Sequence, residues 1–376
     1  MTFKFIHSSD LHLGRRFANI PQAPDGNVRG RLMEARFGAI ERLADAARAA
    51  GAKHILLAGD TFDTATPSVT VLTQALAAMG EDDQLQWWVL PGNHDNLRDA
   101  EPLWDKMASD APANVHAVLD AAPIDMSAGA TLLPCPVTYR SPGRDLTETL
   151  PNMPTADGAL RIGLAHDGIT DFAGLHAHIP PDRDRTAKLD YLALGDWHGR
   201  VRVSERAHYS GSPEQDRFKH DRRGVCLSIS IEGPGAVPEI EEIETGLFHW
   251  LTHDVAAHQG DDISAAFKAG LPAQDRRNTL IKVRASGWAS LASQSGLRQA
   301  ADQLGPEFAY FDLDTAQLGT LYEAADLDQI DQAGALRLAA EQLKAASEAE
   351  NADAGDQEIA ADALARLYAY VKEADL

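Results

Sequence analysis

Residues 53–63 read KHILLAGDTFD, a short apolar run that ends in a glycine and two acidic residues. The Ile and Leu content of this run favours a buried strand over 53–58. Helically spaced apolar residues precede the run, and a helix that begins at a proline follows it. The expected elements are a strand at 3–9, a helix at 31–50, the strand at 53–58, a helix at 67–79 and a strand at 87–90. This β-α-β-α-β order predicts parallel neighbouring strands joined by right-handed crossovers.

The α/β pattern continues beyond these elements and then changes. Further strands are expected near 115–118, 131–135, 160–165, 190–194, 207–209 and 224–231. The sequence GPG at 233–235 and Pro238 indicate a linker, after which a smaller set of alternating strands and helices runs to 312. From Leu321 onward the chain is rich in Ala, Glu, Asp and Leu, which predicts an acidic helical tail. The predicted domains are 1–232, 238–320 and 321–376.

The composition is ordinary for a soluble enzyme except for its acidic excess. Among 376 residues, 34 are Lys or Arg and 56 are Asp or Glu, a net charge of −22. This charge argues against binding nucleic acid or an anionic membrane through bulk attraction.

The apolar runs are too short to cross a bilayer, and Cys135 and Cys226 are too few for a disulfide framework. The polar opening MTFKFIHSSD is unlike a signal peptide, so a cytoplasmic location without membrane contact is expected.

Five short polar segments each follow a predicted strand. They are 9-SDLHLG-14, 59-GDTFD-63, 92-GNHD-95, 166-HD-167 and 195-GDWH-198. Ligands of open α/β sheets bind beyond the carboxyl ends of the strands, so these segments should converge. In Asp10-x-His12 and Asp196-x-His198, an extended backbone would place both side chains on one side. Carboxylate, amide and imidazole ligands without a thiolate suit Mn²⁺, Fe²⁺ or Zn²⁺.

Each segment has a plainer explanation when taken alone. An Asp-x-His pair arises by chance in a chain of this composition, and GDTFD could cap a helix at a strand–helix junction. GNHD is harder to explain as a turn, because nothing in packing requires those four residues. Five such segments at five strand ends favour a metal site over coincidence.

The ordered set resembles the calcineurin-like metallophosphoesterase superfamily, whose pattern runs DxH, GDxxD, GNHD, H and GHxH. Within it, FIHSSDLHLG at 5–14, ALGDWH at 193–198 and YSGSPE at 209–214 resemble the SbcD/YhaO-like DNA repair exonuclease family. The resemblance covers residues 1 to about 230. It implies an α/β fold, namely a sandwich of central β-sheets flanked by helices, with a smaller α/β capping domain and the acidic helical tail.

The resemblance also implies two divalent metal ions, for which Mn²⁺ is the expected choice. One ion would be bound by Asp10, His12, Asp60 and His198, and the other by Asp60, Asn93, His166 and Asp196, with Asp60 bridging. The chain has Asp196 where the family has a histidine. Either this carboxylate still binds a metal ion, or it turns away and leaves the second site weaker.

The family pattern assigns different roles to the remaining polar residues. His94 would face the scissile phosphate, Asp95 would hold the His94 ring, and Asp63 would support the site. The implied reaction is attack on phosphorus by a hydroxide that the two ions generate from water. No GxxxxGK[ST] phosphate loop is present, so this chain is not itself an ATPase.

Three functions are consistent with these observations: a DNA nuclease, a phosphoesterase for a small phosphodiester or nucleotide, and a catalytically silent scaffold. The complete ligand set argues against the scaffold.

Basic residues could form a phosphate-binding groove, or they could form ordinary surface ion pairs. The candidates for DNA binding are Arg15, Arg16, Arg217, Lys219, Arg222 and Arg223. The family further implies an SbcC-like coiled-coil ATPase as partner and allows a homodimer. The tail helices could bind that ATPase or pack on the capping domain.

Overall fold

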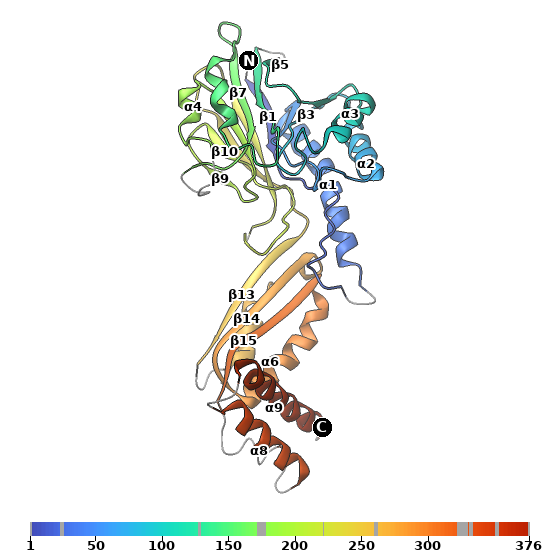
Figure 1. Cartoon of the computed structure of the whole chain (residues 1–376), viewed down its shortest axis with the longest axis vertical. Coiled ribbons are helices and arrows are strands. Elements are labelled where there is room, and N and C mark those ends of the chain that lie inside the picture. The colour runs from blue at the N-terminus through green and yellow to red at the C-terminus, as the bar shows by residue number, and fades with distance from the viewer. Residues whose placement is uncertain are drawn as a thin grey trace. The chain divides into compact units, whose positions relative to one another are not determined.

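A computed structural model describes residues 2–22, 26–126, 129–170, 178–220, 222–258, 262–321, 330, 334–349 and 353–374. The chain divides into two compact units, Met1–His249 and Trp250–Leu376. Each unit is described by itself below (Figure 1).

The first sheet of the first unit has six strands in the order β12-β11-β1-β2-β3-β4. Strands β1 to β4 are parallel, whereas β11 pairs antiparallel with β1 and β12 pairs antiparallel with β11. The strands are β1 (Phe3–Ser8), β2 (His54–Leu57), β3 (Gln86–Val89), β4 (Val115–Ala117), β11 (Val225–Ile231) and β12 (Glu239–Glu244). The predicted strand–helix alternation is therefore confirmed from the first strand to the third.

Three helices cover one face of this sheet, and they are α1 (Val28–Ala50), α2 (Val69–Gly80) and α3 (Glu101–Asp110). In β2, Ile55 and Leu57 pack with these helices, while Leu56 points to the opposite face and into a second core. Successive side chains of a strand point to opposite faces, so a strand that is buried on both faces is apolar throughout. The three consecutive apolar residues Ile55, Leu56 and Leu57 of β2 agree with a strand that is buried on both faces.

The second sheet has the order β5-β6-β7-β8-β10-β9 and packs face to face against the first. Phe5 and Leu56 of the first sheet share a core with Leu132, Ile162 and Tyr191 of the second. Its strands are β5 (Ile124–Asp125), β6 (Ala130–Cys135), β7 (Leu160–His166), β8 (Tyr191–Gly195), β9 (Val201–Arg202) and β10 (Ala207–Tyr209). The short helices η1 (Leu146–Asn152) and α4 (Arg183–Thr186) lie in the connections of this sheet. The expected sandwich is confirmed.

The predicted boundary between the first two domains is wrong. Residues 239–244 were expected to begin the capping domain, but they form β12 and pair with β11. The sequence EIEEIE places Ile240 against the core between the sheets and Ile243 against the core under the helices. The GPG segment at 233–235 is the turn between these two antiparallel strands, and the first unit extends to His249.

The second unit contains a three-stranded sheet in the order β13-β14-β15, in which β14 and β15 are parallel. Phe267, Val283 and Leu297 lie in its core. Its elements are β13 (His249–Ala257), α5 (Ile263–Gly270), η3 (Arg276–Asn278), β14 (Thr279–Ser290), α6 (Leu291–Leu304), η4 (Gly305–Glu307), β15 (Tyr310–Leu321), α8 (Ala335–Ser347) and α9 (Ala354–Ala374).

The acidic tail is not a separate domain in the described residues. Leu364 and Tyr368 of α9 pack in one buried cluster with Leu291 of α6 and Ala340 of α8. The tail helices are therefore part of the second unit. Packing on the capping domain was one of the two alternatives predicted for the tail. Residues 322–329, where the tail was predicted to begin, lie outside the described residues. None of the helices in the described ranges has the length and apolar content needed for a bilayer crossing.

Candidate metal centre

The polar segments predicted from the sequence lie at the carboxyl ends of β1, β2, β3, β7 and β8. The first two segments are joined directly through their backbones. The amide of Asp10 donates to the carbonyl of Gly59 at 3.0 Å, and the amide of His12 donates to the carbonyl of Asp60 at 3.0 Å. The two sheets of the sandwich therefore present all five segments at one edge, as expected for ligands of an α/β fold.

The local backbone at this edge differs from the extended conformation that the Asp-x-His spacing suggested. The φ angle is +55° at Asp10, +45° at His12, +53° at Asp60 and +97° at Asp196. Positive φ is uncommon outside glycine and is found mostly where the surrounding structure enforces it, often at functional sites. The positive φ angles mark sharp turns after β1, β2 and β8, where Asp10, Asp60 and Asp196 follow their strands.

His166 lies in a space that two glycines leave open. A Cβ atom on Gly59 would lie 2.3 Å from His166 Nδ1, and one on Gly195 would lie 1.9 Å from the carbonyl oxygen of Ala58. Gly59 also has a φ of +89°, a conformation that side chains rarely allow. The glycines of GDTFD and GDWH are therefore required for the approach of the His166 ring.

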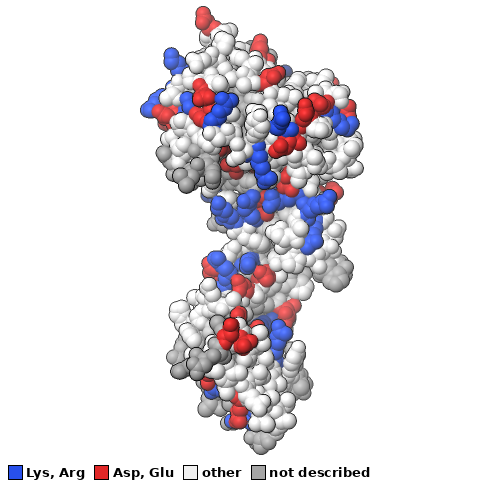
Figure 2. All heavy atoms as spheres, in the orientation of Figure 1, with Lys and Arg blue, Asp and Glu red and all other residues white. Residues whose placement is uncertain are grey.

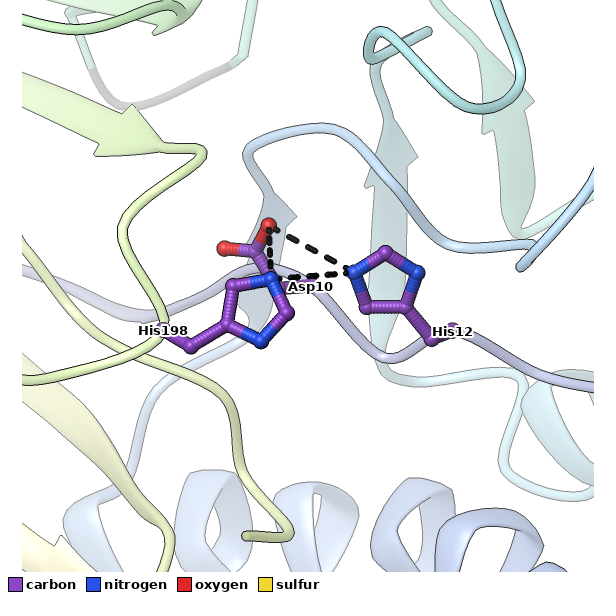
Figure 3. A group of neighbouring side chains, drawn as sticks. All are labelled: Asp10, His12 and His198. Carbon is purple, nitrogen blue, oxygen red and sulfur yellow. Dashed lines mark hydrogen bonds and ion pairs between the residues drawn. The ribbon is translucent and has the colours of Figure 1, made fainter. Parts of the chain in front are cut away.

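Asp10, His12 and His198 form one group of candidate ligands (Figure 3). His12 Nε2 lies 3.2 Å from His198 Nε2, and Asp10 Oδ1 lies 3.9 Å and 3.8 Å from these two nitrogens. The three side chains point toward one another although they come from the loop after β1 and from the loop after β8. A single cation could contact all three atoms.

A second group surrounds Asp60 and His166. Asp60 Oδ1 lies 3.5 Å from His166 Nε2, and Asp60 Oδ2 lies 3.7 Å from His12 Nε2. Asp60 therefore reaches both groups, as a bridging ligand must. Asp196 Oδ1 lies 3.9 Å from His166 Nε2 and accepts a hydrogen bond from the Asn93 amide at 3.0 Å. The Asp196 carboxylate thus points into the site and not away from it.

Each of the three histidines directs Nε2 toward the centre while Nδ1 faces an acceptor. His166 Nδ1 lies 2.8 Å from the carbonyl oxygen of Ala58, and His198 Nδ1 lies 3.0 Å from Asp216. His12 Nδ1 lies 3.3 Å from an oxygen of Asp63. An acceptor at Nδ1 favours the tautomer whose Nε2 lone pair is free to bind a metal ion.

The chemistry of this donor set fits divalent cations. Asp10 Oδ1, Asn93 Oδ1 and His166 Nε2 are buried atoms that have no hydrogen-bond partner among the described residues. Buried polar atoms are normally paired, and these three lie where the ligand assignment places them. Burial of His166 opposes protonation, but Asp60 and the other carboxylates outweigh it and hold the His166 pKa well above its usual value. A divalent cation would supply the positive charge that these carboxylates favour.

Three further predicted residues lie beside the ligands. Asp63 contacts His12, as expected of a supporting residue, and its carbonyl oxygen lies 2.8 Å from His94 Nδ1. Asp95 does not hold the His94 ring as expected, because its carboxylate accepts hydrogen bonds from the backbone amides of Gly92 and Phe62. Burial raises the pKa of Asp95 to about 7, and the Asp60 charge adds to this effect. Asp95 therefore stabilises the loop that carries Asn93.

The basic residues predicted to bind DNA occupy different surroundings. Arg15 lies 3.1 Å from Asp216, and Arg217 contacts both Asp216 and the His198 ring, so these two arginines border the metal site. Lys219 lies over the ring of Trp197, while Arg16 is exposed. Arg222 and Arg223 form ion pairs with Glu242 and Glu244 of β12. The ion-pair alternative thus describes these two residues, and Arg15 and Arg217 also form ion pairs, with Asp216.

Sequence reasoning missed Asp216, and it considered Arg36 only as part of a basic cluster that could bind phosphates. The Asp216 carboxylate is buried against His198, and the buried Arg36 guanidinium donates to the backbone carbonyl of Leu11 and lies 3.6 Å from Asp216. The available signal was the position of Asp216 two residues after 209-YSGSPE-214. Ser212 of that segment donates to the carbonyl of Asp10, so this serine lies beside the site.

Comparisons with known proteins agree with this geometry. The calcineurin-like phosphoesterase family matches residues 3–230, which is more than half of the chain. An uncharacterized metallophosphoesterase, YhaO of Bacillus subtilis (strain 168), is 29% identical over 209 residues, covering 53% of this chain and 50% of that protein. The chain thus spans about half the length of this curated relative.

Two solved structures have low similarity to the chain. The protein TT1561 of Thermus thermophilus aligns at a TM-score of 0.37 and 11% identity, covering 56% of this chain and 90% of that one. A glutamine-dependent NAD+ synthetase from Acinetobacter baumannii aligns at a TM-score of 0.33 and 11% identity, covering 97% and 71%. Neither score is high enough to add to the argument. The family match over residues 3–230 shows that the chain belongs to the calcineurin-like phosphoesterase family, and the candidate ligand groups agree with this membership.

Proposed function

We propose that the chain is a Mn²⁺-dependent DNA nuclease of the SbcD/YhaO type. The observation that carries this proposal is the position of two arginines at the border of the metal site, where Arg217 contacts the His198 ring and Arg15 pairs with Asp216. Their side chains are 24% and 42% exposed in a chain whose net charge is −22. Arginine guanidinium groups bind phosphate oxygens in bidentate geometry, so both residues are suited to a DNA backbone.

A concentration of basic side chains supports the same proposal. Figure 2 shows Lys and Arg side chains gathered at the lower end of the first unit in that view, among Asp and Glu side chains. A local basic region on an acidic protein directs a polyanion to one part of its surface. This arrangement favours a nucleic acid over a neutral substrate.

The residues of the site have separable tasks in phosphodiester cleavage. Divalent cations bound by the ligand set would activate water and neutralise charge on the phosphate. Arg15 and Arg217 would orient the phosphate through its oxygens. Because His94 Nδ1 faces the carbonyl of Asp63, its Nε2 remains available to the phosphate or to the leaving oxygen. Mn²⁺ is the proposed metal because the candidate ligands are oxygen and nitrogen atoms, while Cys135 and Cys226 are buried elsewhere.

A small phosphodiester or nucleotide is the second candidate substrate. Asp196 adds a carboxylate where the related enzymes have a neutral ring, and the net charge of −22 repels a long polyanion. A substrate with a single phosphodiester would encounter less of this repulsion.

The deciding experiment compares DNA with a chromogenic phosphodiester in the presence of Mn²⁺. The wild-type chain should cleave both substrates, and EDTA should abolish both activities. A chain carrying Arg15→Ala and Arg217→Ala should lose most DNA cleavage while it retains more of the diester hydrolysis. Arg16→Ala is the matched control, because it removes a neighbouring exposed arginine. Brisk diester hydrolysis with every form of DNA left intact would contradict the nuclease proposal.

The proposal extends to a partner. The tail helices α8 and α9 carry large apolar side chains that remain exposed in the second unit, namely Leu336, Leu338, Ile359 and Tyr370. Exposed apolar groups on helices are typical of protein-binding surfaces, and an SbcC-like coiled-coil ATPase is the proposed partner. Leu338→Glu together with Ile359→Glu should abolish co-purification with such an ATPase while diester hydrolysis is retained. Loss of self-association in this variant, with ATPase binding unchanged, would instead assign the surface to a homodimer.

A further inference from the structure

Asp216 occupies an unusual position for a residue that is not a candidate metal ligand. Its side chain is only 2% exposed, and one carboxylate oxygen lies 3.0 Å from Nδ1 of His198. The other ring nitrogen of His198 points toward His12 and Asp10. Asp216 therefore contacts the side of the ring that is opposite to the candidate metal.

Several positive groups surround the Asp216 carboxylate. Arg15 Nη1 lies 3.1 Å away, Arg36 Nη2 lies 3.6 Å away and Arg217 Nε lies 2.9 Å away. A carboxylate in these surroundings is ionised and can only accept hydrogen bonds.

Two neighbours of His198 favour opposite tautomers of its ring. Asp216 can only accept, so it favours a proton on Nδ1 and leaves the Nε2 lone pair free. Arg217 Nη2 lies 3.0 Å from Nδ1 and 3.4 Å from Nε2, and an arginine can only donate. A hydrogen bond from Arg217 to Nδ1 would place the proton on Nε2 and prevent this nitrogen from binding a metal ion.

We propose that Asp216 is a positioning residue that fixes His198 in the tautomer and orientation required for metal binding. Arg217 then donates to Asp216 itself, through Nε at 2.9 Å and Nη2 at 3.2 Å, and leaves Nδ1 to donate its proton. Carboxylates that accept from a metal-binding histidine typically contribute about 10- to 100-fold in metal affinity. This inference rests on the metal site of the proposed function but is independent of DNA as its substrate.

The test measures metal binding by the full-length chain without any substrate. Asp216→Asn should weaken the binding of one Mn²⁺ ion by about 10- to 100-fold in calorimetric titration. Glu214→Gln is the matched control, because Glu214 is also buried and lies two residues away, but it pairs with Arg42 and the amides of Leu247 and Phe248. The control should bind Mn²⁺ as the wild type does. Equal Mn²⁺ affinity in Asp216→Asn and the wild type would overturn the proposal.

A double-mutant cycle separates positioning of His198 from a general structural effect. In a chain that already carries His198→Ala, the change Asp216→Asn should cause little further loss of Mn²⁺ affinity, because the residue through which it acts is absent. Losses that add fully would show that Asp216 acts through other groups, and the proposal would fail.

A measurement on the wild-type chain applies even if Asp216→Asn does not fold. Nitrogen NMR of ¹⁵N-histidine-labelled protein, with the His198 signals assigned through His198→Ala, reports which ring nitrogen carries the proton. We expect a protonated Nδ1 in the metal-free chain and in Arg217→Ala. A proton on Nε2 of the neutral ring would contradict the proposal. Because neither measurement depends on catalysis, a failure of the nuclease proposal would remain distinguishable from a failure of this one.

Discussion

The side-chain amide of Asn93 donates a hydrogen bond to Oδ1 of Asp196 at 3.0 Å. This bond directs the Asp196 carboxylate toward His166 and leaves Asn93 Oδ1 buried without a partner among the described residues. An aspartate at the position where the family has a histidine is thus held by another residue of the same ligand group. The substitution is accommodated by the site, and the carboxylate lies among the candidate ligands.

Replacing Asp196 tests this relationship. Asp196→Ala should weaken the binding of one of the two metal ions and lower diester hydrolysis, whereas Asp196→His should retain both metal ions and activity. Both variants keep a β-carbon at the φ of +97°, so neither relieves the backbone at this position as a glycine would. Metal content after dialysis and turnover of a chromogenic diester are the measurements. Two ions bound at wild-type affinity in Asp196→Ala would show that this carboxylate is not a ligand.

His94→Ala should separate catalysis from metal binding. We expect the variant to retain both ions and to lose about 10²- to 10⁴-fold in turnover, the range for removal of a general acid or base. Asp60→Asn serves as the contrast, because Asp60 reaches both ligand groups and its loss should empty the site. If His94→Ala lost a metal ion, His94 would be a ligand, since it also lies with His12 and Asp60 in a third group of neighbouring donors.

Buried neutral histidines should make the chain sensitive to acid. Burial lowers the pKa of His7 from 6.5 to about 3, and burial likewise lowers that of His208 to about 4. At pH values between these lowered pKa values and 6.5, the unfolded chain binds more protons than the folded chain. The free energy of unfolding therefore decreases as the pH falls through this window. Each such group contributes at most about 1.4 kcal/mol per pH unit.

His7→Asn should therefore reduce the pH dependence of unfolding between about pH 6 and pH 4. Thermal unfolding in EDTA is the measurement, because EDTA removes any contribution of bound metal. The wild type is the reference at each pH. Identical slopes for the two chains would show that His7 titrates normally in the folded state.

Leu364→Ala should destabilise the second unit. Leu364 of α9 is fully buried in the cluster with Leu291 and Tyr368, and truncation of a buried leucine costs about 2–5 kcal/mol. Ile359→Ala is the matched control on the same helix, because Ile359 is 68% exposed and its truncation should change the stability by less than about 0.5 kcal/mol. Mn²⁺ affinity should be unchanged in both variants. Equal unfolding temperatures would show that α9 does not contribute to the core of the unit.

The sequence alone predicted the parallel strands and the polar segments that follow them because both are encoded in short contiguous stretches, whereas the sandwich and the ligand set were implied by the resemblance to the superfamily. A buried strand followed by a polar turn is a local pattern, as in ILLAGD at 55–60. The carboxyl ends of neighbouring parallel strands lie at one edge, so the order of the strands was enough to place Asp10 and Asp60 together.

The tertiary structure decided what depends on contacts between distant segments. The linker-like GPG at 233–235 became a turn between β11 and β12 because Ile240 and Ile243 reach two cores that already existed. Asp95 binds backbone amides instead of the His94 ring, and Asp216 binds His198, because buried polar groups pair with whichever partner the fold brings near them. The local pattern of a sequence specifies which residue types are available for a site. Only the assembled fold specifies which of them are in contact.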